Sequence, residues 1–262
     1  RLYGGGGVSV LEYSTNLYLV IAGTFILSVT NVIFPRLSRM AAGERQGELE
    51  DALRTSLHGT LFFVLPMAAG LMLLSRPLIS FLYGGGQFDE QSVELTSSAL
   101  TWLSLGMVGY AVQNILSRAY FARQKGLAPL VAGACSIGAN LALCALLAEP
   151  LGIVGLALSS AVSSTVYALL LLIPMQREHA VNGGLLRDLG KMLLCTLLMA
   201  AAVWAVRGGL GLHLPAGKAG ELLLMAACAL AGCAVYFTAA ALMDLPEGRL
   251  LRQLAGRLGK GG

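Results

Sequence analysis

Charged residues are scarce in this chain. Lys, Arg, Asp and Glu together make up 12% of its 262 residues, whereas a typical soluble domain carries about 25%. The hydrophobic fraction is 56% and the mean hydropathy is +0.73. A soluble fold of this length needs a polar exterior, and the long apolar runs supply none. The scarcity of charge therefore argues against a soluble globular protein and indicates a chain whose outer solvent is lipid.

Signatures of catalysis and metal binding are also lacking. All five cysteines lie inside apolar runs and none has a His at metal-ligand spacing, so we interpret them as small packing residues. The glycine runs at 4–7 and 84–86 are not followed by Lys-Ser or Lys-Thr, which argues against a phosphate loop. No His-Glu-x-x-His, nucleophile elbow or paired-acid motif occurs, and no basic stripe interleaved with aromatics. The sequence predicts neither an enzyme nor a nucleic-acid-binding protein.

What the sequence does contain is a series of long apolar runs. About 20 apolar residues cross a bilayer core as a helix. Seven runs approach or exceed this length, at residues 17–34, 60–83, 93–121, 129–147, 151–174, 192–206 and 221–243. We expect the first to end at Pro35 and the second to kink at Pro66 or Pro77. The pattern predicts an all-α, polytopic transmembrane helix bundle with seven spans.

The basic residues alternate between the two sides of these spans. Fourteen of the 18 Lys and Arg fall on alternate loops or the C-terminal tail: Arg36, Arg39, Arg45 and Arg54; Arg118, Arg123 and Lys125; Arg177, Arg187 and Lys191; Arg249, Arg252, Arg257 and Lys260. By the positive-inside rule this set faces the cytoplasm, which places the first residue outside and the C-terminus inside. The segment 36–57 is then a cytoplasmic loop, with a surface helix expected from Glu48. Leucines and arginines spaced along 245–258 predict an amphipathic helix at the cytoplasmic surface.

Polar residues inside the spans are the candidates for function, because each is costly in hydrocarbon unless it has a partner. Glu12 and Asn16 are four residues apart and share one helix face. Gln113, Asn114 and Arg118 cluster toward the cytoplasmic half of the third span. We predict that these five residues bind substrate in a cavity. The alternative is interhelical hydrogen bonding for the amides and an outer-interface position for Glu12.

Four segments are informative when taken together: 8–17 with 32–38 (Val-Ile-Phe-Pro-Arg-Leu-Ser), 78–89 (Leu-Ile-Ser-Phe-Leu-Tyr-Gly-Gly-Gly-Gln-Phe-Asp), 117–125 and 152–160. They cover most of residues 4–165 and, in their order and spacing, resemble the MurJ (MviN) family of lipid II flippases. The resemblance implies a place in the multidrug/oligosaccharidyl-lipid/polysaccharide exporter superfamily, whose members have two six-helix lobes around a central cavity. The lipid II flippases carry two further spans.

By that comparison the chain resembles spans eight to fourteen. Residues 1–175 would form second-lobe helices, 176–243 two additional C-terminal spans that border a groove for the lipid tail, and 244–262 a cytoplasmic amphipathic tail. The start at Arg1, without an initiator Met, suggests a fragment that lacks the first lobe. The implied partners are lipid II, membrane lipids and that missing lobe.

The resemblance implies flipping of lipid II across the bacterial cytoplasmic membrane by alternating access. The family's usual Arg in the first of these helices corresponds to Asn16, which substitutes a neutral contact for a charged one. Asn140 and Ser160 match two of the sodium ligands of some members, while Cys144 stands in place of an Asp. No other cofactor is expected. Transport would be coupled to sodium ions or to protons. The alternatives are an exporter of another lipid-linked glycan or of small cations, and a non-transporting membrane scaffold.

Overall fold

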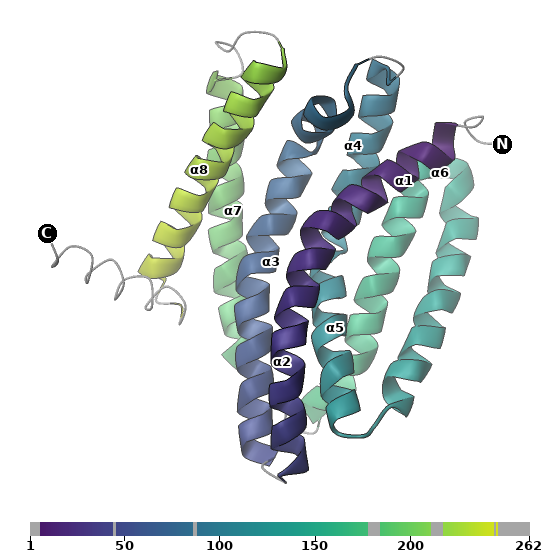
Figure 1. The fold of residues 1–262 in the computed structure, drawn as a ribbon, viewed down its shortest axis with the longest axis vertical. Helices are drawn as coiled ribbons and strands as arrows, with labels where there is room; N and C mark the ends of the chain where they lie inside the picture. Colours follow the sequence, from purple (N-terminus) through teal and green to yellow (C-terminus); the bar gives the residue numbers. More distant parts are fainter. Residues whose placement is uncertain are drawn as a thin grey trace, which may run out of the picture.

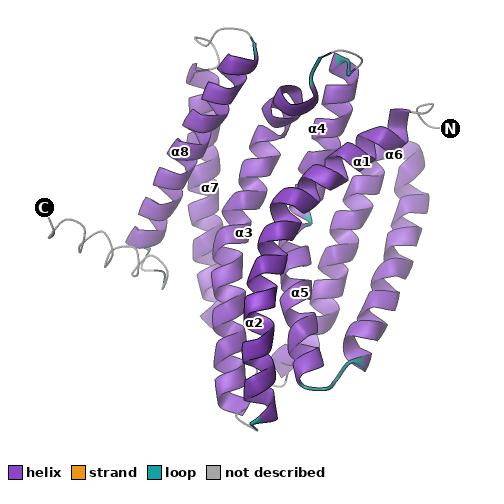
Figure 2. Ribbon diagram, viewed as in Figure 1, coloured by secondary structure: helices purple, strands orange, loops and turns teal. Residues whose placement is uncertain are grey.

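The computed structural model describes residues 6–43, 46–85, 88–177, 184–210, 217–243 and 245. In chain order the elements are α1 (Gly6–Tyr18), the π-helix η1 (Leu19–Gly23), α2 (Thr24–Ala42), α3 (Gln46–Tyr83), α4 (Glu90–Leu105), α5 (Met107–Ala122), α6 (Leu127–Arg177), α7 (Gly184–Leu210) and α8 (Lys218–Leu242). The helices lie side by side along the long axis of the molecule (Figure 1), and the described part contains helices and short connections without a strand (Figure 2). The all-α prediction is confirmed.

The helices supply seven membrane crossings. Ser9–Ala42, which joins α1, η1 and α2, is long and apolar enough to span, and so are α3, α6, α7 and α8. A sixth candidate is the pair α4 and α5, which are bent by 42° at the break between them. The seventh crossing arises because α6 is a folded-back hairpin rather than one straight helix.

The turn of this hairpin is at Gly152. Its φ of 56° and ψ of −129° are non-helical, in a region that only glycine adopts without strain. A straight helix of 51 residues would be about 76 Å long, more than twice the hydrocarbon thickness. The Tyr167 hydroxyl donates to the Pro129 carbonyl at 3.1 Å, and Asn140 Nδ2 donates to Ser163 Oγ at 3.1 Å. These bonds hold the two halves antiparallel, as separate crossings.

The sequence predicted that the first span ends at Pro35, and this prediction is wrong. Helix α2 continues through this proline to Ala42, and α3 begins four residues later at Gln46. Pro35 lies on the exposed side of the helix, where the lost backbone hydrogen bond and the bulk of its ring disturb no packed neighbour. The expected loop 36–57 is therefore helical over most of its length.

Helix α3 is the element on which the others pack. It contacts α2, α4, α5, α7 and α8. Helices α7 and α8 are attached to α3 by polar contacts at several levels along its length. They are His58 Nε2 with Asp188 Oδ2 at 3.3 Å, the Tyr236 hydroxyl with the Phe62 carbonyl at 2.6 Å, Arg207 Nη1 with the Leu73 carbonyl at 2.8 Å, and Ser80 Oγ with Glu221 Oε1 at 2.7 Å. The α7–α8 pair is thus fixed against one helix of the bundle.

The connection between α3 and α4 is closed by aromatic packing. The ring centroid of Tyr13 lies 4.9 Å from that of Tyr83 and 5.8 Å from that of Phe88. Asp89 then caps α4 by accepting a hydrogen bond from the Ser92 amide at 2.9 Å. The side-chain and backbone hydrogen bonds of Ser92 lower the pKa of the Asp89 carboxyl. Of the predicted amphipathic tail at 244–262, only Leu245 is among the described residues, where it is buried.

Candidate functional site

A polar stripe runs along the exposed side of the first span. It contains Glu12, Asn16, Thr24, Ser28, Asn31 and Arg39. Exposed amide and carboxylate groups at membrane depth are costly against lipid tails. The stripe therefore indicates a surface that faces water or another part of the protein.

The buried side of α1 fixes this orientation. Ser14 is fully buried, and its hydroxyl lies 2.7 Å from the Val10 carbonyl and 3.0 Å from the Thr96 carbonyl on α4. Because Glu12 and Asn16 stand on either side of Ser14 in the chain, anchoring that hydroxyl to α4 directs both of them outward. Both side chains are exposed, and their role in a cavity stays a prediction.

The three polar residues of the third span lie in a different environment. The Arg118 guanidinium is 5.4 Å from the ring centroid of Phe34 on α2, a cation–π contact. Asn114 Nδ2 donates to the Tyr110 carbonyl at 2.7 Å. Both side chains are half-buried, and so is that of Gln113. The backbone carbonyl of Gln113 accepts a hydrogen bond from Ser117 Oγ at 2.6 Å. Here Asn114 makes a hydrogen bond within its own helix, whereas the sequence analysis weighed a bond between helices.

The five predicted substrate-binding residues therefore do not form one cluster. Arg118 contacts Phe34, which lies 22 residues along the same continuous helical span as Glu12. At 1.5 Å per residue this separates the two groups by about 33 Å, the thickness of the bilayer core. They lie at opposite ends of the span, and substrate binding by either group stays a prediction.

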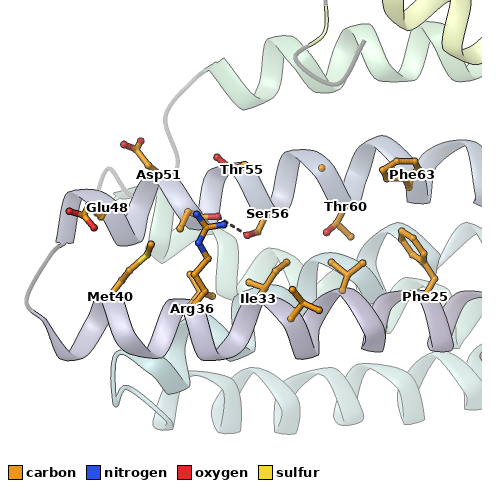
Figure 3. A pocket seen from close by; sticks show the side chains of 15 residues that line it. Phe25, Ile33, Arg36, Met40, Glu48, Asp51, Thr55, Ser56, Thr60 and Phe63 are labelled. Carbon is orange, nitrogen blue, oxygen red and sulfur yellow. Dashed lines mark hydrogen bonds between the residues drawn. The ribbon is translucent and has the colours of Figure 1, made fainter. Parts of the chain in front are cut away.

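A pocket that the sequence analysis missed lies between α2 and α3 (Figure 3), with a volume of about 590 Å³. Arg36, Glu48 and Asp51 line its polar end, and Phe25, Val32 and Phe63 belong to its apolar part. These charged residues belong to the segment 36–57, for which the sequence predicts a cytoplasmic loop. A signal was present, because Leu49, Leu53, Leu57 and Leu61 repeat every four residues and are all buried, as on one face of a helix.

A second pocket of about 240 Å³ lies between α3, α7 and α8. Its lining contains no charged residue and includes Phe63, Met67, Met199, Val203 and Phe237. Phe63 lines both pockets, so the two adjoin at this ring. The first pocket is amphipathic and the second is apolar.

The two predicted sodium ligands are linked only through Ser163, whose Oγ accepts from Asn140 Nδ2 at 3.1 Å and donates to the Ser160 carbonyl at 3.0 Å. Asn140 contacts Ser163 and accepts from Cys144 Sγ at 3.6 Å, whereas Ser160 is exposed and its hydroxyl bonds to the Leu156 carbonyl at 3.2 Å. Neither half of the hairpin, 127–148 or 151–177, contains an Asp or Glu. A hard cation prefers several oxygen ligands that include carboxylates, and the residues present do not fit one.

The model of one protein family, described as lipid II flippase MurJ, matches residues 3–212. The chain belongs to the MurJ family. A probable lipid II flippase MurJ of Rhizobium meliloti (strain 1021) is 28% identical over 239 residues, which cover 90% of this chain and 45% of that protein. A probable lipid II flippase MurJ of Thermotoga maritima is 27% identical over 242 residues, which cover 92% of this chain and 47% of that protein.

The fold agrees with a solved MurJ structure. A lipid II flippase MurJ in an inward closed conformation superposes with a TM-score of 0.77 at 26% identity, over 92% of this chain and 48% of that one. The chain thus spans about half the length of the relatives it matches. The resemblance to the MurJ family is confirmed, and so is a multi-pass membrane protein.

Proposed function

We propose that this chain forms the second half of a lipid II flippase of the bacterial cytoplasmic membrane. The observation that carries the proposal is the polar stripe on the first span, in a chain whose family and fold are those of MurJ. An exposed stripe with Glu12 and Asn16 is unsuited to lipid contact and suits one wall of a hydrated cavity. The other wall would come from a first lobe of the same protein.

In this proposal the headgroup and the tail of the substrate take separate routes. Rocking of two lobes about the site exposes the cavity to each side in turn. The diphosphate-sugar headgroup moves along the stripe while the tail stays in lipid, alongside the apolar pocket between α3, α7 and α8. No bond of the substrate is made or broken, so the protein acts as a transporter.

The charges at the two ends support an assignment of sides. Arg39, Arg123 and Lys125 lie at the end where α2 meets α3 and α5 meets α6, and the positive-inside rule assigns that end to the cytoplasm. The C-terminus then lies in the cytoplasm as well. The coupling ion, sodium or a proton, remains a prediction, and no step of the mechanism depends on it.

Asn16 favours one second candidate, an exporter of another lipid-linked glycan. A neutral amide binds a diphosphate less strongly than the guanidinium that the family usually places there. Binding of lipid II to the intact protein distinguishes the two candidates: absence of binding, with a different glycan lipid bound, favours the exporter.

The experiment is complementation of cells depleted of their own flippase. The intact protein restores wall synthesis, and Glu12→Gln combined with Asn16→Ala lowers the rescue. Thr238→Ala, an exposed change on α8 that lines neither the pocket between α2 and α3 nor the pocket between α3, α7 and α8, serves as control and rescues fully. Failure of the unchanged protein to rescue, although it is present in the membrane, rejects the proposal.

A further inference from the structure

We propose that the pocket between α2 and α3 binds one zwitterionic phospholipid whose headgroup carries a primary amine. Its phosphate lies at Arg36, and its ammonium group lies at the carboxylates of Asp51 and Glu48. The proposal concerns a lipid of the surrounding membrane and does not depend on which substrate the protein transports.

The charges of the pocket select this chemistry. Arg36 on α2 faces the pocket together with two acidic residues of α3, so the lining carries one positive and two negative charges. Figure 3 shows Arg36 extending from α2 toward α3, with Ser56 beside it. A guanidinium matches a phosphate through two parallel hydrogen bonds, and an ammonium group offers three donors to carboxylates. Two carboxylates disfavour a ligand that is only anionic, which includes a diphosphate.

The polar end lies at the depth of phospholipid headgroups. Arg36 is six residues from the end of α2 at Ala42, and Asp51 is five residues from the start of α3 at Gln46. At 1.5 Å per residue both charges are within about 9 Å of the helix ends. A headgroup layer occupies roughly 5–8 Å on each side of the hydrocarbon core, so the charges meet a headgroup without entering the middle of the bilayer.

The rest of the pocket is suited to an acyl chain. From Ile33 toward Phe63 the lining is predominantly apolar, and two of its residues are open to the surroundings, Val32 at 77% and Phe63 at 43% exposure. The volume of about 590 Å³ falls within the range of sites that hold small ligands. The pocket therefore offers a polar and an apolar compartment in the order in which a phospholipid presents its parts.

Two other ionisable side chains of α3 have partners within the protein. Glu50 lies 3.8 Å from Arg123, and His58 lies 3.3 Å from Asp188. Within the described ranges, Arg36 and Asp51 form no ion pair or side-chain hydrogen bond. Glu50 and His58 are thus held by neighbouring helices, while Arg36 and Asp51 remain available to a ligand at the pocket.

The test is lipid retention by the intact flippase, measured by native mass spectrometry after exchange into equal mixtures of phosphatidylethanolamine, phosphatidylcholine and phosphatidylglycerol. We expect phosphatidylethanolamine to be retained in preference to both others. Phosphatidylcholine has no N–H to donate, and phosphatidylglycerol has no cation to meet the carboxylates. Because one juxtamembrane Arg contributes about 1 kcal/mol to lipid binding, Arg36→Gln lowers phosphatidylethanolamine retention about fivefold.

Three variants give matched comparisons. Asp51→Asn removes a repelling carboxylate and shifts retention toward phosphatidylglycerol. Arg39→Gln removes an exposed arginine that lies on α2, as Arg36 does, but does not line the pocket. This change leaves lipid retention unchanged. Thr55→Trp fills the pocket from an exposed position on α3 and lowers retention of all three lipids.

Three results would overturn the proposal. One is equal retention of the three lipids by the unchanged protein, and another is an equal effect of the Arg36 and Arg39 substitutions. The third is a cysteine at position 55 that cross-links to the other lobe while no lipid is retained, which would show that protein fills the pocket.

Discussion

The turn of the α6 hairpin gives a sharp prediction about packing. In Gly155→Ala the added Cβ would lie 2.2 Å from the Leu147 carbonyl oxygen and 2.7 Å from its carbon. Both atoms belong to the backbone of the facing half of the hairpin, so no side-chain rotation relieves the contact. A carbon–oxygen contact needs about 3.3 Å, which requires the two halves to separate locally by about 1 Å.

Overpacking of this kind costs about 1–3 kcal/mol, and a backbone obstacle places the cost near the upper value. Gly138→Ala is the matched control, because it lies in the same element and its Cβ would meet nothing within 4 Å. There the change removes glycine from a helix interior, a gain of about 0.5–1 kcal/mol. The two substitutions, identical in chemistry, therefore differ by about 3–4 kcal/mol and have opposite signs.

The assay is thermal unfolding of the intact protein in one detergent at one scan rate. The shift in melting temperature is about 2–4 °C per kcal/mol for a domain of 150–250 residues and smaller for a longer protein. We therefore expect Gly155→Ala to melt several degrees below the unchanged protein and Gly138→Ala at or slightly above it. Equal melting temperatures for the two variants would refute the close backbone approach at Gly155, and with it the hairpin turn described.

Three further predictions follow from single contacts. Tyr236→Phe removes the hydroxyl that donates to the Phe62 carbonyl at 2.6 Å and destabilises the protein by about 1 kcal/mol, measured as a lower melting temperature; an unchanged one would show that this bond does not attach α8 to α3. Asn140→Ala removes the donor to Ser163 and weakens the hairpin by about 0.6 kcal/mol, seen as faster hydrogen exchange in α6, whereas Cys135→Ser on the same half leaves exchange unchanged. Asn16→Ala lowers transport without lowering the melting temperature. Ser14→Val removes a buried hydroxyl near two carbonyls, which costs about 1–3 kcal/mol of stability and lowers the melting temperature; a similar loss of stability in both variants would place Asn16 in the packing rather than in the cavity.

Apolar runs and charge were sufficient to predict the fold. The runs at 129–147 and 151–174 correspond to the two halves of α6, and Gly152 turns the chain two residues after the predicted break at 148–150. The predicted end of the first span at Pro35 was wrong, because Pro35 is exposed and α2 continues through it to Ala42. A proline ends a helix reliably only where its neighbours forbid the bend, and one sequence does not show which side of the helix they occupy.

The site was predicted less completely than the fold. Glu12 and Asn16 share a face because of their spacing, and this face is the exposed one. The contact of Arg118 with Phe34 and the pocket that contains Arg36 both depend on helices distant in the sequence lying side by side. Periodicity predicts which side of a helix is apolar, but not which helix will cover it.

The central claim, that the chain provides one wall of a lipid II pathway, is tested most directly by following lipid II itself. The measurement is the fraction of lipid II that is open to a cleaving enzyme added outside cells depleted of their own flippase. With the intact protein present we predict that most lipid II becomes cleavable, and that Glu12→Gln with Asn16→Ala reduces this fraction while the protein remains folded in the membrane. Lipid II that stays protected, although the unchanged protein is present and stable, would contradict the account.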